Sequence, residues 1–220
     1  MGILDLRFAQ VVKSKIANRK SKIPFLWLLG RSEMARIILI TGGSRSGKSA
    51  YAQRLAETFP GPRVFVATCP VLDQELRDRI RKHQAARAGR GWETVEEQTD
   101  LALALRRARQ ANVALVDCLT LWVNNLMYQA QQQGRELTEE ELAARCRDVL
   151  AACDGSPSTL IFVTNEVGMG IVPESAVCRR YRDLAGRCNQ LFAAAAETVA
   201  LIVCGLPLVL AGQLPLQQPG

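Results

Sequence analysis

The sequence is poor in the residues that several common kinds of site require. Its 220 residues contain one histidine, and its seven cysteines form no C-x-x-C pair. Structural zinc sites use four Cys or His ligands at close spacing, so the sequence argues against one. Because the cysteines lie mostly within apolar segments, we interpret them as buried thiols of a reducing compartment and expect a cytoplasmic protein.

Long hydrophobic runs and aromatic residues are also scarce. No stretch approaches the roughly 18 apolar residues of a membrane-spanning helix, since the best run, 199–204, stops at Gly205. Aromatic residues make up 5% of the chain, although a nucleic-acid motor needs stacking aromatics along a basic groove. We therefore expect no integral membrane segment and no nucleic-acid partner.

The positive charge is concentrated in the first 33 residues. This segment holds seven Lys or Arg against Asp5 and Glu33, so it contributes +5 of the net +7 and leaves +2 for the rest. A basic amphipathic membrane arm is one interpretation. The abrupt change in composition favours the other, in which translation starts at Met34. We expect an extension over 1–33, one domain over 34–210 and a loose tail over 211–220.

After Met34, short β-branched runs alternate with longer helical patterns. This alternation predicts an α/β fold with a mostly parallel sheet and helices on both faces. The expected strands are nearly continuous in apolar residues, as strands buried on both faces should be; they cover 36–41, 63–68, 113–118, 159–164 and 198–204, with a short edge strand at 206–210. The expected helices cover 48–59, 73–88, 99–110, 119–133, 138–153 and 174–197, and Thr138 to Glu141 matches a capping box.

A glycine-rich motif lies between the first strand and the first helix. The segment GGSRSGKS fits G-x-x-x-x-G-K-[ST] and predicts a P-loop nucleoside-triphosphate-binding fold. Its backbone N–H groups would cradle phosphates at the start of the helix. Lys48, which we expect to be an exposed charge, would reach the β and γ phosphates, and Ser49 would ligate Mg²⁺. The predicted nucleotide-binding residues are Gly42, Gly43, Ser44, Arg45, Ser46, Gly47, Lys48 and Ser49.

A carboxylate near the metal is the usual partner of such a loop. Asp117 ends the apolar run 113–117 and fits that role, and it could also cap the helix that starts at Leu119. The segment Thr164-Asn165-Glu166-Val167 lacks the Lys and Asp of a guanine-reading N-K-x-D motif, which disfavours a signalling GTPase. Among the classes of nucleoside-triphosphate enzyme considered, transfer of a group to a small molecule remains.

The single histidine, His83, lies at the margin of an apolar helical stripe made by Leu72, Leu76 and Ile80. A histidine in such a place is commonly just a partly exposed helix residue. Neighbouring basic residues such as Arg79 and Lys82 would keep its imidazole neutral and hold a phosphate beside it. A neutral imidazole is a competent nucleophile toward phosphorus.

Several segments together resemble one enzyme family. These are GGSRSGKS, D-x-E-L-x-x-R-I-x-x-H at 73–83, W-x-T-x-E at 92–96, VDCLTLWVNNL at 116–126 and TNEVGMGIVPE at 164–174. In colinear order they resemble the bifunctional adenosylcobinamide kinase/adenosylcobinamide-phosphate guanylyltransferase of cobalamin biosynthesis. The resemblance runs from about residue 37 to residue 210.

The resemblance implies two reactions, with ATP or GTP and Mg²⁺, in a homotrimer. An NTP phosphorylates the aminopropanol hydroxyl of adenosylcobinamide, and GTP then donates GMP to that phosphate through a guanylyl-histidine, which falls on His83. His83 and Lys48 are the implied catalytic residues, with Ser49 and Asp117 toward the metal. Position by position, the resemblance also implies nucleotide contacts at Ala67, Thr68, Cys69, Gln84, Ala85, Ala86, Arg87, Glu96 and Asp117.

Some alternatives stay open at this point. Glu166 could bind Mg²⁺, orient the cobinamide hydroxyl or cap a neighbouring helix. A plain P-loop kinase without a covalent intermediate is the rival activity, and a nucleotide-dependent regulatory protein is the rival from another class.

Overall fold

A computed structural model of the protein describes residues 35–70, 81, 85 and 87–215. The chain divides into two units, Met1–Ser32 and Glu33–Gly220, and every described residue belongs to the second. The predicted extension, most of the predicted helix 73–88 and the end of the predicted tail therefore lie outside the described residues. None of the described helices is long and apolar enough to cross a membrane.

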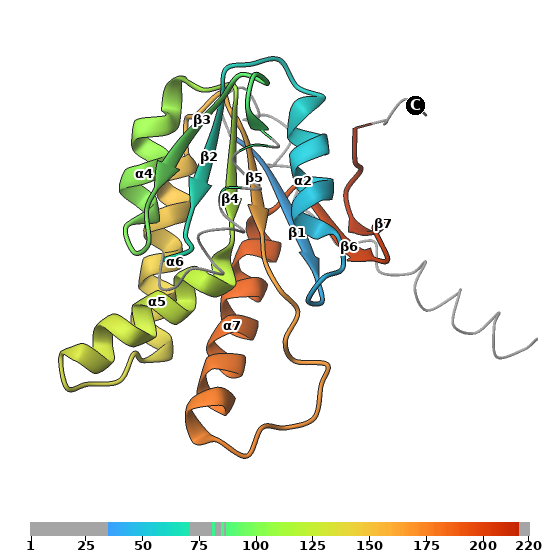
Figure 1. The fold of residues 1–220 in the computed structure, drawn as a ribbon. Coiled ribbons are helices and arrows are strands. Elements are labelled where there is room, and N and C mark those ends of the chain that lie inside the picture. The colour runs from blue at the N-terminus through green and yellow to red at the C-terminus, as the bar shows by residue number, and fades with distance from the viewer. Residues whose placement is uncertain (1–34, 71–80, 82–84, 86, 216–220) are drawn as a thin grey trace, which may run out of the picture. The chain divides into compact units, whose positions relative to one another are not determined.

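A seven-stranded sheet forms the centre of this unit (Figure 1). Its order is β3-β2-β4-β5-β1-β6-β7, in which β1 to β6 run parallel and β7 pairs antiparallel with β6. The predicted mostly parallel sheet is confirmed. The strands are β1 (Arg36–Gly42), β2 (Arg63–Ala67), β3 (Trp92–Glu96), β4 (Val113–Asp117), β5 (Thr159–Val163), β6 (Thr198–Val203) and β7 (Leu206–Ala211).

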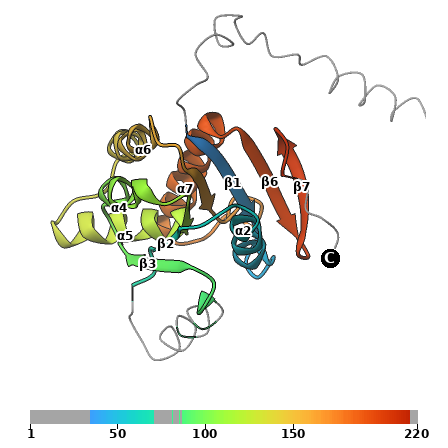
Figure 2. The ribbon, with the colours of Figure 1, turned by 90° about the horizontal axis from the view of Figure 1, so that it is seen from above.

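Helices cover both faces of the sheet (Figure 2). Along β1, Ile37 and Leu39 face the layer of α4, α5, α6 and α7, whereas Ile38 and Ile40 face α2. This alternation follows from the two-residue period of a strand. The helices are α2 (Lys48–Glu57), α4 (Leu101–Arg107), α5 (Leu119–Gln132), α6 (Glu139–Cys153) and α7 (Ala176–Ala195), with a 3₁₀ turn, η2 (Ala108–Gln110), after α4.

Local signals located most of these elements. The predicted capping box is present, because the Thr138 hydroxyl accepts from the Glu141 N–H and the Glu141 carboxylate accepts from the Thr138 N–H. Strand β3 was not predicted, because its side chains are half-buried or exposed at the sheet edge and give no continuous apolar run. Strand β7 reaches Ala211, one residue into the expected tail, and Leu214 packs against the core beside α2.

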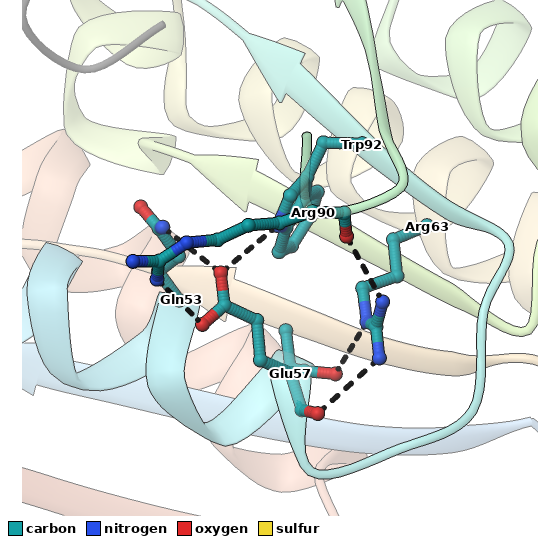
Figure 3. Close-up of polar contacts among 6 residues, drawn as sticks. Gln53, Glu57, Arg63, Arg90 and Trp92 are labelled. Carbon is teal, nitrogen blue, oxygen red and sulfur yellow. Dashed lines mark hydrogen bonds and ion pairs between the residues drawn. The ribbon is translucent and has the colours of Figure 1, made fainter. Parts of the chain in front are cut away.

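A polar cluster joins the end of α2 to the starts of β2 and β3 (Figure 3). The Glu57 carboxylate accepts hydrogen bonds from Gln53 Nε2 at 3.0 Å, Trp92 Nε1 at 3.1 Å and an Arg90 guanidinium nitrogen at 3.2 Å. The Arg63 guanidinium donates to the carbonyls of Ala56, Glu57, Phe59 and Arg90. Arg63 thus adds donors to carbonyls at and just beyond the end of α2 and ties them to Arg90, which precedes β3.

We expect Glu57→Ala to destabilise the fold by about 1–3 kcal/mol, because it removes the acceptor of the half-buried Trp92 N–H. Thermal or urea unfolding would measure the change. Glu93→Ala, which removes an exposed carboxylate on β3, is the matched control and should leave stability nearly unchanged. Equal losses in the two variants would contradict the assigned role of Glu57.

The same cluster predicts a pH dependence. Burial raises the pKa of Glu57, but hydrogen bonds from Gln53, Trp92 and Arg90 outweigh it and hold the pKa below the ordinary value of 4.5. The stabilisation is therefore complete above that ordinary value and is lost as pH falls through the lower pKa of the folded state. The stability difference between wild type and Glu57→Ala should shrink in acid, and an undiminished difference there would contradict the ionic contribution.

Candidate functional site

The carboxyl ends of five neighbouring strands bring several of the predicted site residues to one edge of the sheet. In the register of the sheet, Glu96, Ala67, Asp117, Val163 and Ile40 are successive cross-strand partners. The phosphate loop continues from β1 at this same edge (Figure 1). The structure thus brings together groups that are far apart in the sequence. Ligands of open α/β sheets bind at this edge.

The phosphate loop is held in place by its own backbone and by the turn between β6 and β7. Ser46 N–H donates to the Gly43 carbonyl at 3.2 Å, and Gly205 N–H donates to the Ser46 carbonyl at 2.8 Å. Gly42 must lack a side chain, because a Cβ there would lie 2.6 Å from the Ile202 carbonyl oxygen. Gly47 precedes α2 in the left-handed region, with φ of 88°.

Lys48 is the first residue of α2, and its side chain folds back over the loop. Its Nζ donates to the Gly43 carbonyl at 3.1 Å. The expectation of an exposed charge is wrong, because Lys48 is only 8% exposed. Burial lowers the pKa of Lys48, while Asp117 and Cys118 oppose that shift by favouring the charged ammonium. The side chain is thus an inward-facing cation beside the cradle.

Asp117 ends β4 and is half-buried. The charge of Asp117 acts on both Lys48 and Arg87. Burial lowers the pKa of Arg87, and the Asp117 carboxylate opposes that shift. Asp117 is not the N-cap residue of α5, because Cys118 occupies that position and makes no side-chain cap. Ser49 is half-buried at the start of α2. A hydroxyl and a carboxylate are the hard oxygen donors that suit Mg²⁺.

Thr68 locks the end of β2 to the end of β4. Its fully buried hydroxyl donates to the Cys118 carbonyl at 2.9 Å and accepts from the Cys118 N–H at 2.7 Å. The Asn125 amide donates to the carbonyls of Thr68 and Gln98. The side chain of Thr68 is therefore engaged inside the protein, whereas Ala67 and Cys69 on either side of it are half-buried.

Arg87 is a buried cation that packs on the Phe65 ring of β2. It is 5% exposed, and its guanidinium carbon lies 3.6 Å from the centre of the Phe65 ring. Its Nε and one terminal nitrogen find no hydrogen-bond partner among the residues that the structure describes. Buried guanidinium donors usually meet an acceptor, so Arg87 is suited to receiving an anionic group.

The other predicted residues are distributed as follows. Glu96 is exposed at the end of β3, and Ala85 is also exposed. Ser44 and Arg45 are exposed on the loop. His83, Gln84 and Ala86 lie outside the described residues.

One group at this edge was not foreseen. Thr164 and Asn165, which follow β5, are hydrogen-bonded to Asn189 of α7, and Asn165 also reaches Thr120 of α5. Thr164 and Asn165 belong to the segment TNEVGMGIVPE and Asn189 to the predicted helix 174–197, but no local pattern connects them, because their contacts join parts of the chain that are distant in sequence.

Comparisons with known proteins show the family of the chain. A family model described as cobinamide kinase / cobinamide phosphate guanyltransferase matches residues 38–210. Over 177 residues the chain is 39% identical to the bifunctional adenosylcobalamin biosynthesis protein CobU of Escherichia coli, covering 77% of this chain and 97% of that protein. It is 41% identical over 177 residues to the corresponding protein CobP of Pseudomonas aeruginosa, covering 80% of this chain and 97% of that one.

A likeness to a solved structure concerns the fold alone. The chain resembles a prototypical ATPase of a bacterial type III secretion system with a TM-score of 0.52 at 10% identity, covering 76% of this chain and 51% of that one. Its P-loop fold thus agrees with the nucleotide-binding motif.

Proposed function

Because the chain belongs to the cobinamide kinase / cobinamide phosphate guanyltransferase family, we propose that one phosphate loop serves both transfers and that His83 carries the guanylyl group. The observation that supports the shared loop is the juxtaposition of the cradle, Lys48 and Asp117 at the edge of the sheet, and the role of His83 rests on the resemblance to the family. The proposal includes the cytoplasmic homotrimer that the resemblance implies.

In the first transfer, the acceptor is the aminopropanol hydroxyl of adenosylcobinamide. Its oxygen attacks the γ phosphorus of ATP or GTP, the bond to the β–γ bridging oxygen breaks, and the nucleoside diphosphate leaves while the hydroxyl proton passes to solvent. Lys48 and the loop N–H groups stabilise the charge that develops on the phosphate oxygens. Ser49 and Asp117 would hold Mg²⁺, which neutralises phosphate charge when bound.

In the second transfer, a neutral imidazole nitrogen of His83 attacks the α phosphorus of GTP and pyrophosphate leaves. The phosphate of adenosylcobinamide phosphate then attacks the guanylyl phosphorus, the P–N bond breaks, and the imidazole is restored as adenosylcobinamide-GDP forms. The buried donors of Arg87 support a contact with an anionic part of the nucleotide.

An assay with adenosylcobinamide and GTP tests the function directly. We expect the mass of adenosylcobinamide-GDP in the product, and label on the protein when the α phosphate of GTP is labelled. A labelled protein excludes a plain kinase, and turnover of adenosylcobinamide excludes a purely regulatory protein. Phosphorylation without protein label would overturn the covalent intermediate and leave the kinase.

A further inference from the structure

Thr120 of α5, Asn189 of α7 and the two residues that follow β5 form a hydrogen-bonded relay. The Thr164 hydroxyl donates to Asn189 Oδ1 at 2.6 Å, and Asn189 Nδ2 donates to the Asn165 carbonyl at 3.0 Å. Asn165 Nδ2 in turn donates to the Thr120 hydroxyl at 3.0 Å. We call Thr120, Thr164, Asn165 and Asn189 the β5 relay. Thr120 and Thr164 are buried and Asn165 and Asn189 are half-buried, so these bonds are partly shielded from water.

The relay holds the chain segment 164–168, which lies between the phosphate loop and Asp117. Val163, the last residue of β5, pairs with Ile40 of β1 on one side and with Asp117 of β4 on the other. Residues 164–168 therefore leave the sheet between the phosphate loop and Asp117. Glu166 N–H donates to the Gly42 carbonyl at 3.1 Å, and the Glu166 carboxylate accepts from Gly168 N–H at 2.8 Å.

The phosphate loop does not depend on the relay for its shape. Its cradle is held by the bonds from Ser46 N–H and Lys48 Nζ to the Gly43 carbonyl and from Gly205 N–H to the Ser46 carbonyl. None of these bonds involves a relay residue. The segment 164–168 touches the loop at its first residue, where Glu166 N–H donates to the Gly42 carbonyl, and the bonds that shape the cradle from Gly43 to Lys48 are separate from it. Loss of the relay should therefore displace residues 164–168 while those bonds remain.

We propose that Asn189 is a positioning residue for the phosphoryl acceptor, acting through the segment 164–168 that carries Glu166. The inference rests on the proposed function, because the acceptor is the hydroxyl phosphorylated in the first transfer. Asn189 ties this segment at two points, through the Thr164 side chain and the Asn165 carbonyl. The segment borders the cradle without belonging to it, so it is placed to orient the acceptor instead of the triphosphate.

Kinetics of variants test this proposal. Asn189→Ala removes both bonds, Thr164→Val removes the hydroxyl bond alone, and Thr164→Ser keeps it. We expect Asn189→Ala and Thr164→Val to lower kcat for phosphorylation of adenosylcobinamide by about tenfold to a hundredfold, the scale of a small misplacement of reacting groups. Thr164→Ser should retain the rate, and all three should keep wild-type nucleotide affinity and labelling from α-phosphate-labelled GTP.

Thr198→Val supplies the matched control. Thr198 is 1% exposed, and its hydroxyl donates to the Gln213 carbonyl at 2.9 Å at the opposite edge of the sheet. This variant should lose comparable stability with unchanged kinetics. Unchanged phosphorylation in Asn189→Ala, or an equal loss of nucleotide affinity in Asn189→Ala and Thr164→Val, would overturn the proposal. Wild-type protein that fails to phosphorylate adenosylcobinamide would instead refute the proposed function.

Discussion

His83→Asn should abolish formation of adenosylcobinamide-GDP while adenosylcobinamide phosphate still accumulates. Guanylyl transfer through a covalent intermediate needs a nucleophile that attacks the α phosphorus, whereas transfer of the γ phosphoryl group needs positioning and charge neutralisation. Asparagine is polar and smaller than histidine but has no nitrogen able to attack phosphorus. One substitution should therefore separate two activities that share a phosphate loop.

Protein labelling and product mass would measure this separation. The variant should take up no label from α-phosphate-labelled GTP, and its remaining kinase activity is the internal control for folding and nucleotide binding. In the wild type the trapped adduct should be labile to acid and stable to base, as a phosphoramidate is. Label on His83→Asn, or a wild-type adduct that resists acid, would assign the nucleophile to another residue.

Replacing Lys48 should slow both reactions. Its side chain is 8% exposed and folds over the cradle, so Lys48→Met is a sharper test than alanine because it keeps the apolar stem and removes only the ammonium. Losing a charge-assisted contact to phosphate should cost about 2–3 kcal/mol, or roughly a hundredfold in rate. Steady-state rates of phosphorylation and guanylyl transfer would measure the loss.

Arg54→Met is the matched control for this change. Arg54 is an exposed cation on the same helix, with its guanidinium carbon 5.9 Å from the centre of the Tyr51 ring. Its replacement also removes one positive charge from α2, but it should leave both rates near wild type. If Lys48→Met turns over like Arg54→Met at saturating GTP, then the triphosphate does not rest on this loop in the way proposed.

Local patterns in the sequence predicted much of the fold. The strands β1, β2, β4, β5 and β6 are buried on both faces, so their apolar side chains form nearly continuous runs that can be recognised without a structure. Strand β3 was not predicted, because an edge strand has few buried side chains and its alternation of buried and exposed residues is weak. An apolar pattern in the sequence therefore indicates burial, and it identifies a strand only where the strand is buried on both faces.

The sequence by itself also determined the phosphate cradle, because strand, glycine-rich turn and helix are consecutive and their geometry is local. It did not determine that Lys48 is buried or that the charge of Asp117 at the end of β4 acts on it, because β4 is distant from the loop in the sequence. Nor did it determine the partners of Thr68, which lie 50 residues along the chain at Cys118 and 57 at Asn125.

The order of the strands was decided by the tertiary structure alone. A parallel strand can be placed on either side of its predecessor through a crossover helix, so the sequence order does not reveal its neighbours. In this protein β5 lies between β1 and β4. That placement puts Thr164 and Asn165 between the phosphate loop and Asp117 and brings Asn189, 25 residues from Thr164 along the chain, into hydrogen-bond contact.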